Sequence, residues 1–195
     1  YNDCAKKVRY VFLDACDVPY ILDDEGKLKY QAQWLFAMSQ KQLDWLCSKA
    51  LKFDDPGWSV MFITHSLLLP QEVDNPPEIS KNMELLRRIV LAYKKGENYS
   101  ENFGDGDFER KVDAPFNDYI RGDIIGFLVG DYHYDDVVYY DDIPLILTGN
   151  AVMYDKGEKN RVRRNGDETE LLFDMVTVDK EKRKICVVRV GSGEN

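Results

Sequence analysis

The sequence has few cysteines and no long apolar segment, and these shortages exclude several classes of protein. No two of its four cysteines form a CxxC pair, which argues against a zinc ribbon. No run approaches the roughly 18 apolar residues of a membrane span. No stretch resembles a signal peptide, which favours a cytoplasmic location. We expect the cysteines to be buried, reduced thiols; they are Cys4, Cys16, Cys47 and Cys186.

Positive charge is also scarce. Lysine and arginine number 26 against 35 aspartates and glutamates, so the formal net charge is −9. Proteins that bind duplex nucleic acid cluster Lys and Arg against the phosphates, so we expect no such partner. An acidic chain is compatible with a metal-centred site, because the metal itself supplies the positive charge that an anionic substrate needs.

The apolar residues that are present, 44% of the chain, suffice for one sizeable core, and we expect a single domain over residues 1–195. The first part of the chain alternates strand and helix, and the last part contains strands alone. This order predicts an α/β protein with a layered sheet and helices on the outside. Strands are expected at 7–15, 58–65, 123–131, 137–140, 143–149, 171–179 and 184–191, and helices at 39–53 and 80–95.

Local signals predict the helix ends and the connecting segments. Ser39 is a good N-cap, and Gln42 completes a capping box three residues later. Residues 18–34 predict a hairpin-like excursion. Residues 96–121 are polar and predict an inserted loop, either lying over a site or merely flexible. Its GDGD stretch (104–107) lacks the spaced ligands of a calcium loop. The tryptophans, expected in the core rather than on a base-stacking platform, are Trp34, Trp45 and Trp58.

The two histidines stand at corresponding places. His65 follows the apolar run WSVMFIT, and His133 follows IIGFLVG, with Asp131 two positions before it. In open α/β sheets the carboxyl ends of strands border the binding crevice, so both histidines are expected at one edge of one sheet. Imidazole and carboxylate together suit zinc, manganese or iron. The alternative is that each histidine ends a strand and hydrogen-bonds a loop.

The order of motifs resembles the carboxyl-terminal half of a calcineurin-like metallophosphoesterase of bacterial or phage type. SQKQLDWLCSKALKFDDPGWSVMFITHSLLL is followed by IIGFLVGDYHYD, by IPLILTGN and by the closing hairpin FDMVTVDKEKRKICVVRVGSGEN. In that family a QLxWL helix precedes a strand that ends in a metal-ligand histidine. A later strand ends in Gly-His-x-His, and the next ends in Thr-Gly or Ser-Gly.

The resemblance implies a layered, α/β/β/α-like sandwich and a dinuclear site of Mn, Fe or Zn that hydrolyses phosphate mono- or diesters. His65 matches a ligand of the second metal, and His133 matches a ligand of the first. Asp131 stands where the family has the other histidine of its motif, a ligand of the second metal. This departure adds negative charge and shortens the reach of the donor. Leu67 is a second departure, because the family commonly has proline there.

The resemblance also implies that part of the site is absent. The family's first half supplies Asp-x-His, Gly-Asp and Gly-Asn-His motifs, and no histidine precedes His65. An alignment of GDYH with the opening Asp-x-His fails, because no histidine follows His133. The chain is therefore expected to be a carboxyl-terminal portion, inactive alone, binding metal weakly or not at all. We also expect self-association through the surface left by the missing half.

Other residues offer weaker candidates, and they identify neither catalytic nor substrate-binding groups. Ser66 follows His65, but no GxSxG-like elbow supports a Ser/His/Asp triad. Asn150 is expected in a turn. A second interpretation makes the chain a non-catalytic, phosphoesterase-like module for binding or assembly, with Asp131 marking a degenerate site. The acidic cluster, expected to be solvated turn residues, comprises Asp135, Asp136, Asp141 and Asp142.

Overall fold

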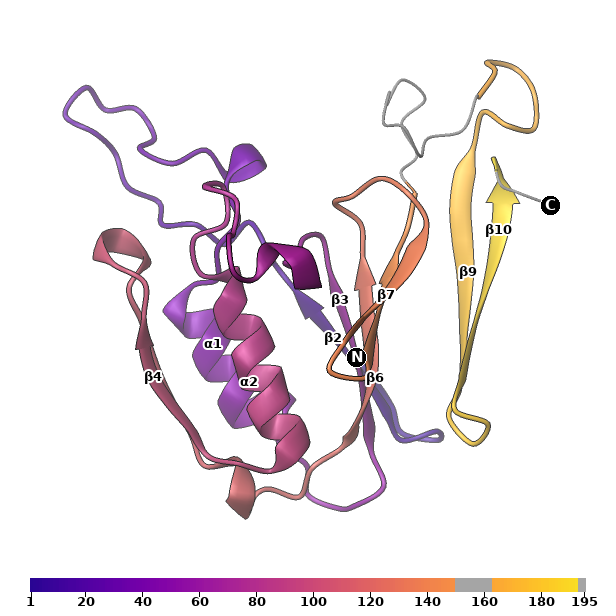
Figure 1. The fold of residues 1–195 in the computed structure, drawn as a ribbon, viewed down its shortest axis with the longest axis horizontal. Helices are drawn as coiled ribbons and strands as arrows, with labels where there is room; N and C mark the ends of the chain where they lie inside the picture. Colours follow the sequence, from indigo (N-terminus) through magenta and orange to yellow (C-terminus); the bar gives the residue numbers. More distant parts are fainter. Residues whose placement is uncertain (150–162, 193–195) are drawn as a thin grey trace.

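In the computed structural model, which describes residues 1–149 and 163–192, a mixed sheet of six strands runs through the molecule (Figure 1). The strand order is β1-β2-β3-β6-β8-β7. The four central strands are parallel, and β1 and β7 are antiparallel edges. The strands are β1 (Asn2–Asp3), β2 (Val8–Leu13), β3 (Ser59–Thr64), β6 (Asp123–Val129), β7 (Asp136–Tyr140) and β8 (Ile143–Leu147).

Two helical segments cover one face of this sheet (Figure 1). The first is α1 (Gln40–Trp45), which continues as the π-helical turn η2 (Leu46–Ala50), and the second is α2 (Met83–Lys95). The mixed α/β class expected from the sequence is therefore confirmed. Short 3-10 turns lie in the connections: η1 (Ala32–Trp34), η3 (Pro70–Glu72), η4 (Gly106–Phe108) and η5 (Phe116–Asp118).

The N-cap prediction is confirmed for the first helix, but the capping box is half right. The hydroxyl of Ser39 accepts a hydrogen bond from the backbone N–H of Gln42 at 3.2 Å. The side chain of Gln42 does not return to Ser39. It bonds instead to the backbone N–H and carbonyl of Asp14, just beyond β2. The cap therefore joins the start of α1 to the end of a sheet strand.

The π-helical turn η2 has its own partner on the sheet. The N–H of Leu51 donates to the carbonyl of Leu46 at 3.0 Å, five residues back. The last carbonyl groups of a helix have no helical donors. The guanidinium of Arg9 on β2 donates to the carbonyls of Lys49, Ala50 and Lys52. Burial lowers the pKa of Arg9, which nonetheless stays charged because an arginine pKa begins so high.

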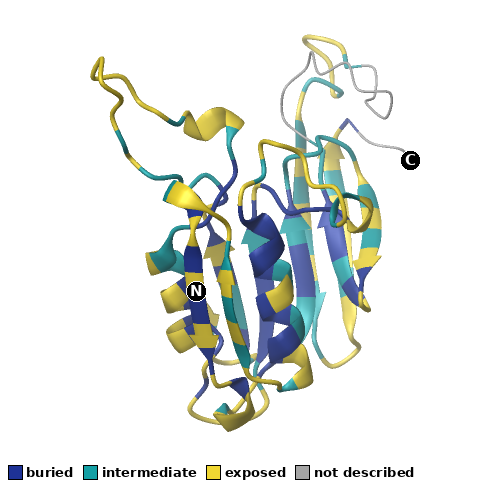
Figure 2. Cartoon of the chain, turned by 60° about the vertical axis from the view of Figure 1, so that its left-hand side comes forward, coloured by how far each residue is buried: buried dark blue, intermediate teal, exposed yellow. Residues whose placement is uncertain are grey.

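The core lies between the sheet and the helices (Figure 2). Phe62 on β3 and Phe127 on β6 stack with ring centroids 4.6 Å apart, and both are buried. The helices contribute an apolar stripe at helical spacing, as the sequence predicted. The stripe residues that are fully buried include Leu43, Leu46, Leu85, Leu86 and Ile89.

The prediction of a loop over residues 96–121 is wrong. The segment forms a hairpin of β4 (Tyr99–Phe103) and β5 (Arg110–Ala114), which lies beyond the helices (Figure 1). Along both strands, more buried residues alternate with less buried ones. The charged residues among them made this alternation hard to recognise in the sequence. The buried guanidinium of Arg110 donates to the carbonyl of Met38 at 2.7 Å, so the hairpin is tied to the approach of α1.

A second hairpin, β9 (Leu172–Asp179) and β10 (Lys184–Gly191), lies opposite the helices (Figure 1). We call it the ribbon; the sequence predicted it. Arg189 attaches it to the sheet by donating to Asp174 within the ribbon and to Asp135 before β7, at distances of 2.5–3.0 Å. Its other face, with Phe173, Met175 and Val188, is exposed.

Several burial predictions are corrected by this arrangement. Trp34 is 66% exposed and Trp45 is 43% exposed, whereas Trp58 is half-buried and stacks on Phe53. All four cysteines are free, and only Cys47 is buried. Cys186 is exposed because it lies on the outer face of the ribbon. No helix among the described residues is long and apolar enough to cross a membrane.

Candidate functional site

The carboxyl ends of β3 and β6 meet at one edge of the sheet. The two strands are parallel neighbours, with Thr64 opposite Val129. Beyond them, the carbonyl of His65 accepts hydrogen bonds from the backbone N–H groups of Gly130 and Asp131, at 3.0 and 2.8 Å. The residues after the two strands are therefore held side by side by backbone bonds. His133 follows in the same turn, so both histidines lie beyond the same edge.

Asp131 connects His65 with Ser66. Nε2 of His65 lies 3.5 Å from Oδ1 of Asp131, and the hydroxyl of Ser66 donates to Oδ2 at 2.9 Å. The imidazole is about half exposed, with a side-chain exposure of 52%, and the carboxylate is less exposed at 27%. The ring of Phe36 meets the imidazole edge to face. The carboxylate is thus oriented by a hydroxyl on one side while its other oxygen faces an accessible imidazole.

His133 does not join this pair in a metal-binding group. Residues 1–149 and 163–192 contain no group of three or more His, Cys, Asp or Glu side chains placed to hold a metal ion. The backbone of His133 is left-handed, with φ of 58°. The hydroxyl of neighbouring Tyr132 lies 2.9 Å from the carbonyl oxygen of Leu67 and 2.5 Å from Oε2 of Glu72, and it donates its single proton to one of them. The turn that carries His133 is therefore anchored at Tyr132.

The end of β2 brings further polar groups to this edge, which the sequence reasoning missed. Asp14 follows β2, and its carboxylate accepts from the N–H of Cys16 at 2.8 Å. Burial raises the pKa of the Cys16 thiol, and the negative charges of Asp14 and Asp131 raise it further. Because Leu13 of β2 is opposite Thr64 of β3, Asp14 and Cys16 follow β2 at the same edge as His65. The available signal was the FLDAC stretch, in which an acid follows a strand in the same way as Asp131.

The arrangement does not support nucleophilic catalysis by serine. In a Ser/His/Asp triad the imidazole stands between the hydroxyl and the carboxylate and takes the proton of the hydroxyl. Here Asp131 stands between Ser66 and His65. The hydroxyl of Ser66 donates to this carboxylate rather than to an imidazole.

The acidic cluster expected to be solvated is only partly so. Asp135 forms a two-pronged ion pair with Arg189 and accepts from the N–H of Gly149 at 2.9 Å, so it has a structural role. Asp141 pairs loosely with Arg87 at 3.8 Å, and Asp142 is exposed. Asn150, expected in a turn after β8, lies outside the described residues.

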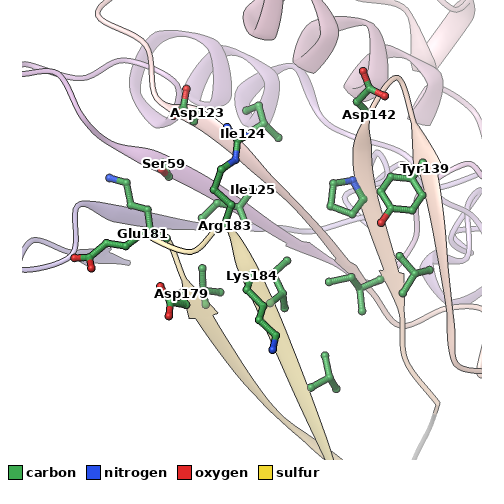
Figure 3. Close-up of a pocket in the computed structure, with 17 residues that line it drawn as sticks. Ser59, Asp123, Ile124, Ile125, Tyr139, Asp142, Asp179, Glu181, Arg183 and Lys184 are labelled. Atoms are coloured by element: carbon green, nitrogen blue, oxygen red, sulfur yellow. The ribbon is translucent and has the colours of Figure 1, made fainter.

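Two of the hollows between the sheet and the ribbon bear on the site. One, of about 440 Å³, adjoins His65 at the carboxyl edge. The other, of about 650 Å³, lies at the opposite end, where Ser59 and Asp123 begin β3 and β6 (Figure 3). Its rim carries charges of both signs, including Asp123, Asp179, Arg183 and Lys184 (Figure 3). Only the smaller hollow can serve chemistry at His65.

Comparison with known proteins adds no relative. No family model, no curated protein and no solved structure matches the chain. The functional assignment therefore depends on the order of sequence motifs and on the geometry of the strand ends.

Proposed function

We propose that this chain carries part of a metal-dependent phosphoesterase site of the calcineurin-like type. The observation that carries the proposal is the pairing of His65 with Asp131 beyond two adjacent parallel strands. Carboxyl ends of parallel strands are where α/β sheets bind ligands. The motif order around both residues resembles that family.

The spacing of the pair fits a shared divalent ion. Two donors that each lie about 2.1 Å from one tetrahedral ion are roughly 3.4 Å apart. Nε2 of His65 and Oδ1 of Asp131 are 3.5 Å apart. The donor set of one imidazole and one carboxylate suits Mn, Fe or Zn. When bound, such an ion supplies positive charge for a phosphate ester and lowers the pKa of water.

The remaining groups position this pair. Ser66 donates to Oδ2 of Asp131 and so leaves Oδ1 facing the imidazole. Outer hydrogen bonds of this kind orient ligands and sustain metal affinity. For His133 to become a third ligand of the same ion, its turn would have to adopt a different orientation. Three donors cannot hold two ions, so we expect this chain to bind at most one divalent ion, weakly, and to be inactive alone.

The order of layers supports the finer fold proposed with this function. Helices α1 and α2 lie on one face of the sheet, and the ribbon lies on the other (Figure 1). An α/β/β/α-like sandwich has this sequence of layers from the helices to the second sheet. The exposed apolar side chains Phe173, Met175 and Val188 on the outer ribbon face also support the proposed self-association.

A second candidate function is a non-catalytic, phosphoesterase-like module for binding or assembly. Two observations favour it. The described residues hold no group of three metal ligands, and the resemblance places a histidine where this chain has Asp131. In this case the His65–Asp131 pair is the remnant of a metal site.

Metal titration of Asp131 variants separates the two functions. Calorimetry with Mn²⁺, Zn²⁺ and Mg²⁺ should show one weak site in the wild type. Asp131→Ala should weaken it about tenfold or more, since a direct donor is lost. Asp131→His should shift preference toward Zn²⁺, because the new donor is nitrogen. Asp142→Ala removes an exposed carboxylate elsewhere and should change nothing.

Equal affinity of the wild type and Asp131→Ala for all three ions would show that Asp131 is no ligand and would favour the non-catalytic module. An activated ester such as p-nitrophenyl phosphate should not be turned over above background. Metal-dependent turnover that His133→Ala abolishes would contradict the expected inactivity. It would mean that other residues, or a second copy, complete the site.

A further inference from the structure

We infer that the 440 Å³ hollow beside His65 binds the apolar organic group of an ester, an aryl or alkyl chain, and that the ribbon thereby determines specificity. The inference rests on the proposed function, because it assigns the phosphate to His65 and the organic group to the hollow. Besides His65, the lining residues that matter for the inference are Ile63, Leu128, Leu172, Asp174 and Val176.

The walls of the hollow are apolar and come from two different elements. Ile63 and Leu128 project from β3 and β6 on the face away from the helices, since their neighbours Phe62 and Phe127 belong to the core. Leu172 and Val176 face them from β9. A volume of about 440 Å³ lies within the range of small-molecule sites, roughly 300–1,000 Å³. A ring or short chain can therefore lie between the sheet and β9.

The mouth of the hollow is kept open by glycines. A Cβ on Gly130 would lie 3.6 Å from Nδ1 of His65, in van der Waals contact with the imidazole. A Cβ on Gly149 would approach Leu172 to 3.0 Å, which is tighter than ordinary contact. Without these side chains, the imidazole borders the apolar space directly. An ester with its phosphate at His65 therefore meets Leu128 and Leu172 with its organic group.

Charge excludes the more polar substrates. None of the described residues that line the hollow is Lys or Arg. Its one carboxylate, Asp174, already receives two hydrogen bonds from Arg189, at 2.5 and 3.0 Å. That guanidinium is in turn shared with Asp135. Among the described residues of the lining, a nucleotide or polyphosphate would find no cation to pair with, whereas a neutral apolar group needs none.

Amide chemical-shift titrations of the full chain test this inference. Benzyl alcohol, added without metal, should shift the amides of Leu128, Leu172 and Val176 in a saturable way. With Zn²⁺ present, phenyl phosphate should bind roughly tenfold or more tightly than methyl phosphate, because only the former fills the hollow. Val176→Trp should fill the hollow from the ribbon and remove this preference.

Matched variants guard against simple misfolding. Val188→Trp places the same ring on the outer ribbon face and should leave the preference intact. Leu172→Ala removes a side chain that lines the hollow and should weaken the binding of benzyl alcohol several-fold, while Met175→Ala, on the outer ribbon face, should not. Absence of saturable shifts with benzyl alcohol, or equal effects of the two tryptophan variants, would overturn the inference. Binding of benzyl alcohol without any response to methyl phosphate and Zn²⁺ would support the hollow and count against the phosphoesterase alone.

Discussion

The two faces of the sheet are stabilised in different ways. On the helix face, Phe62 of β3 is fully buried at 0% exposure, and α1 and α2 cover the strands (Figure 2). On the ribbon face, Phe12 of β2 is 60% exposed. Both side chains are phenylalanines on adjacent parallel strands, so only the covering element differs. The helices close their face by packing, whereas the ribbon leaves much of the other face open.

The ribbon is attached by polar contacts more than by burial. Arg189 bonds to Asp135 and Asp174, and Lys180 donates to the carbonyl of Gly57. Packing of large apolar side chains contributes several kcal/mol per residue, whereas a hydrogen bond to a charged group contributes about 1.5–3 kcal/mol. The helix face should therefore determine global stability, and the ribbon face local order near the candidate site.

The largest expected effect tests the two phenylalanines directly. Phe62→Ala should lower the free energy of unfolding by about 3–5 kcal/mol, because it leaves a cavity against Phe127 and the helices. Phe12→Ala should change it by less than about 0.5 kcal/mol, because most of that ring is already in water. Urea unfolding followed by circular dichroism measures both. Similar losses would mean that the ribbon face is covered in solution.

An intermediate effect is expected from detaching the ribbon. Arg189→Met removes the partner of Asp174, whose side chain is only 8% exposed, and should cost about 1–3 kcal/mol. Hydrogen exchange should speed up at β9 and β10 amides while α2 amides keep their protection. Arg183→Met, an exposed arginine in the ribbon turn, is the control. Uniform acceleration across sheet and helices would show that the two faces unfold together.

The smallest effect concerns the buried thiol on the helix face. Burial, and secondarily the charge of Asp44, raises the pKa of Cys47 to about 12 from 9.0. The thiol therefore favours the folded state fully below about pH 9, and that contribution is lost as the pH rises toward 12. Unfolding free energies from pH 8.5 to 11 should fall more steeply for the wild type than for Cys47→Ala. Tyr93 has a similarly raised pKa but is present in both proteins, so the difference isolates Cys47.

Parallel pH curves for these two proteins would contradict the prediction. A thiol reagent at pH 8 provides an independent comparison between the regions. Cys186 on the ribbon is exposed and should react at once, whereas Cys47 should react only after unfolding.

Much of the fold could be predicted because burial leaves periodic signals. The runs at 58–65 and 123–131 are apolar at nearly every position, as expected for strands covered on both faces, and became β3 and β6. The hairpin β4–β5 was not predicted, because its strands YSENF and RKVDA alternate buried or half-buried residues with polar and charged ones. The start of α2 also differed: Asn82, not Ser80, precedes it, because the Asn82 amide bonds to both backbone groups of Met38.

The candidate site likewise has features that the sequence predicts and features that it does not. The sequence predicts that His65 and Asp131 follow strands that end at one edge of the sheet, whereas the structure adds that these two strands are parallel neighbours. The position of His133 depends on a left-handed residue and on the anchoring of Tyr132 to Leu67 and Glu72. No periodic pattern in the sequence predicts such a turn. The contribution of Asp14 requires knowing that β2 lies beside β3.

The π-helical turn η2 has a consequence for the ancestry of this chain. A bond that spans five residues, as from Leu51 to Leu46, holds one residue more than an α-helical turn does. Relatives with a regular helix here should carry a single-residue deletion between these two leucines. Such relatives should keep a cation at position 9, because the last carbonyls of a regular helix lack helical donors as well. The extra residue is thus expected to have been gained without a change in its partner on the sheet.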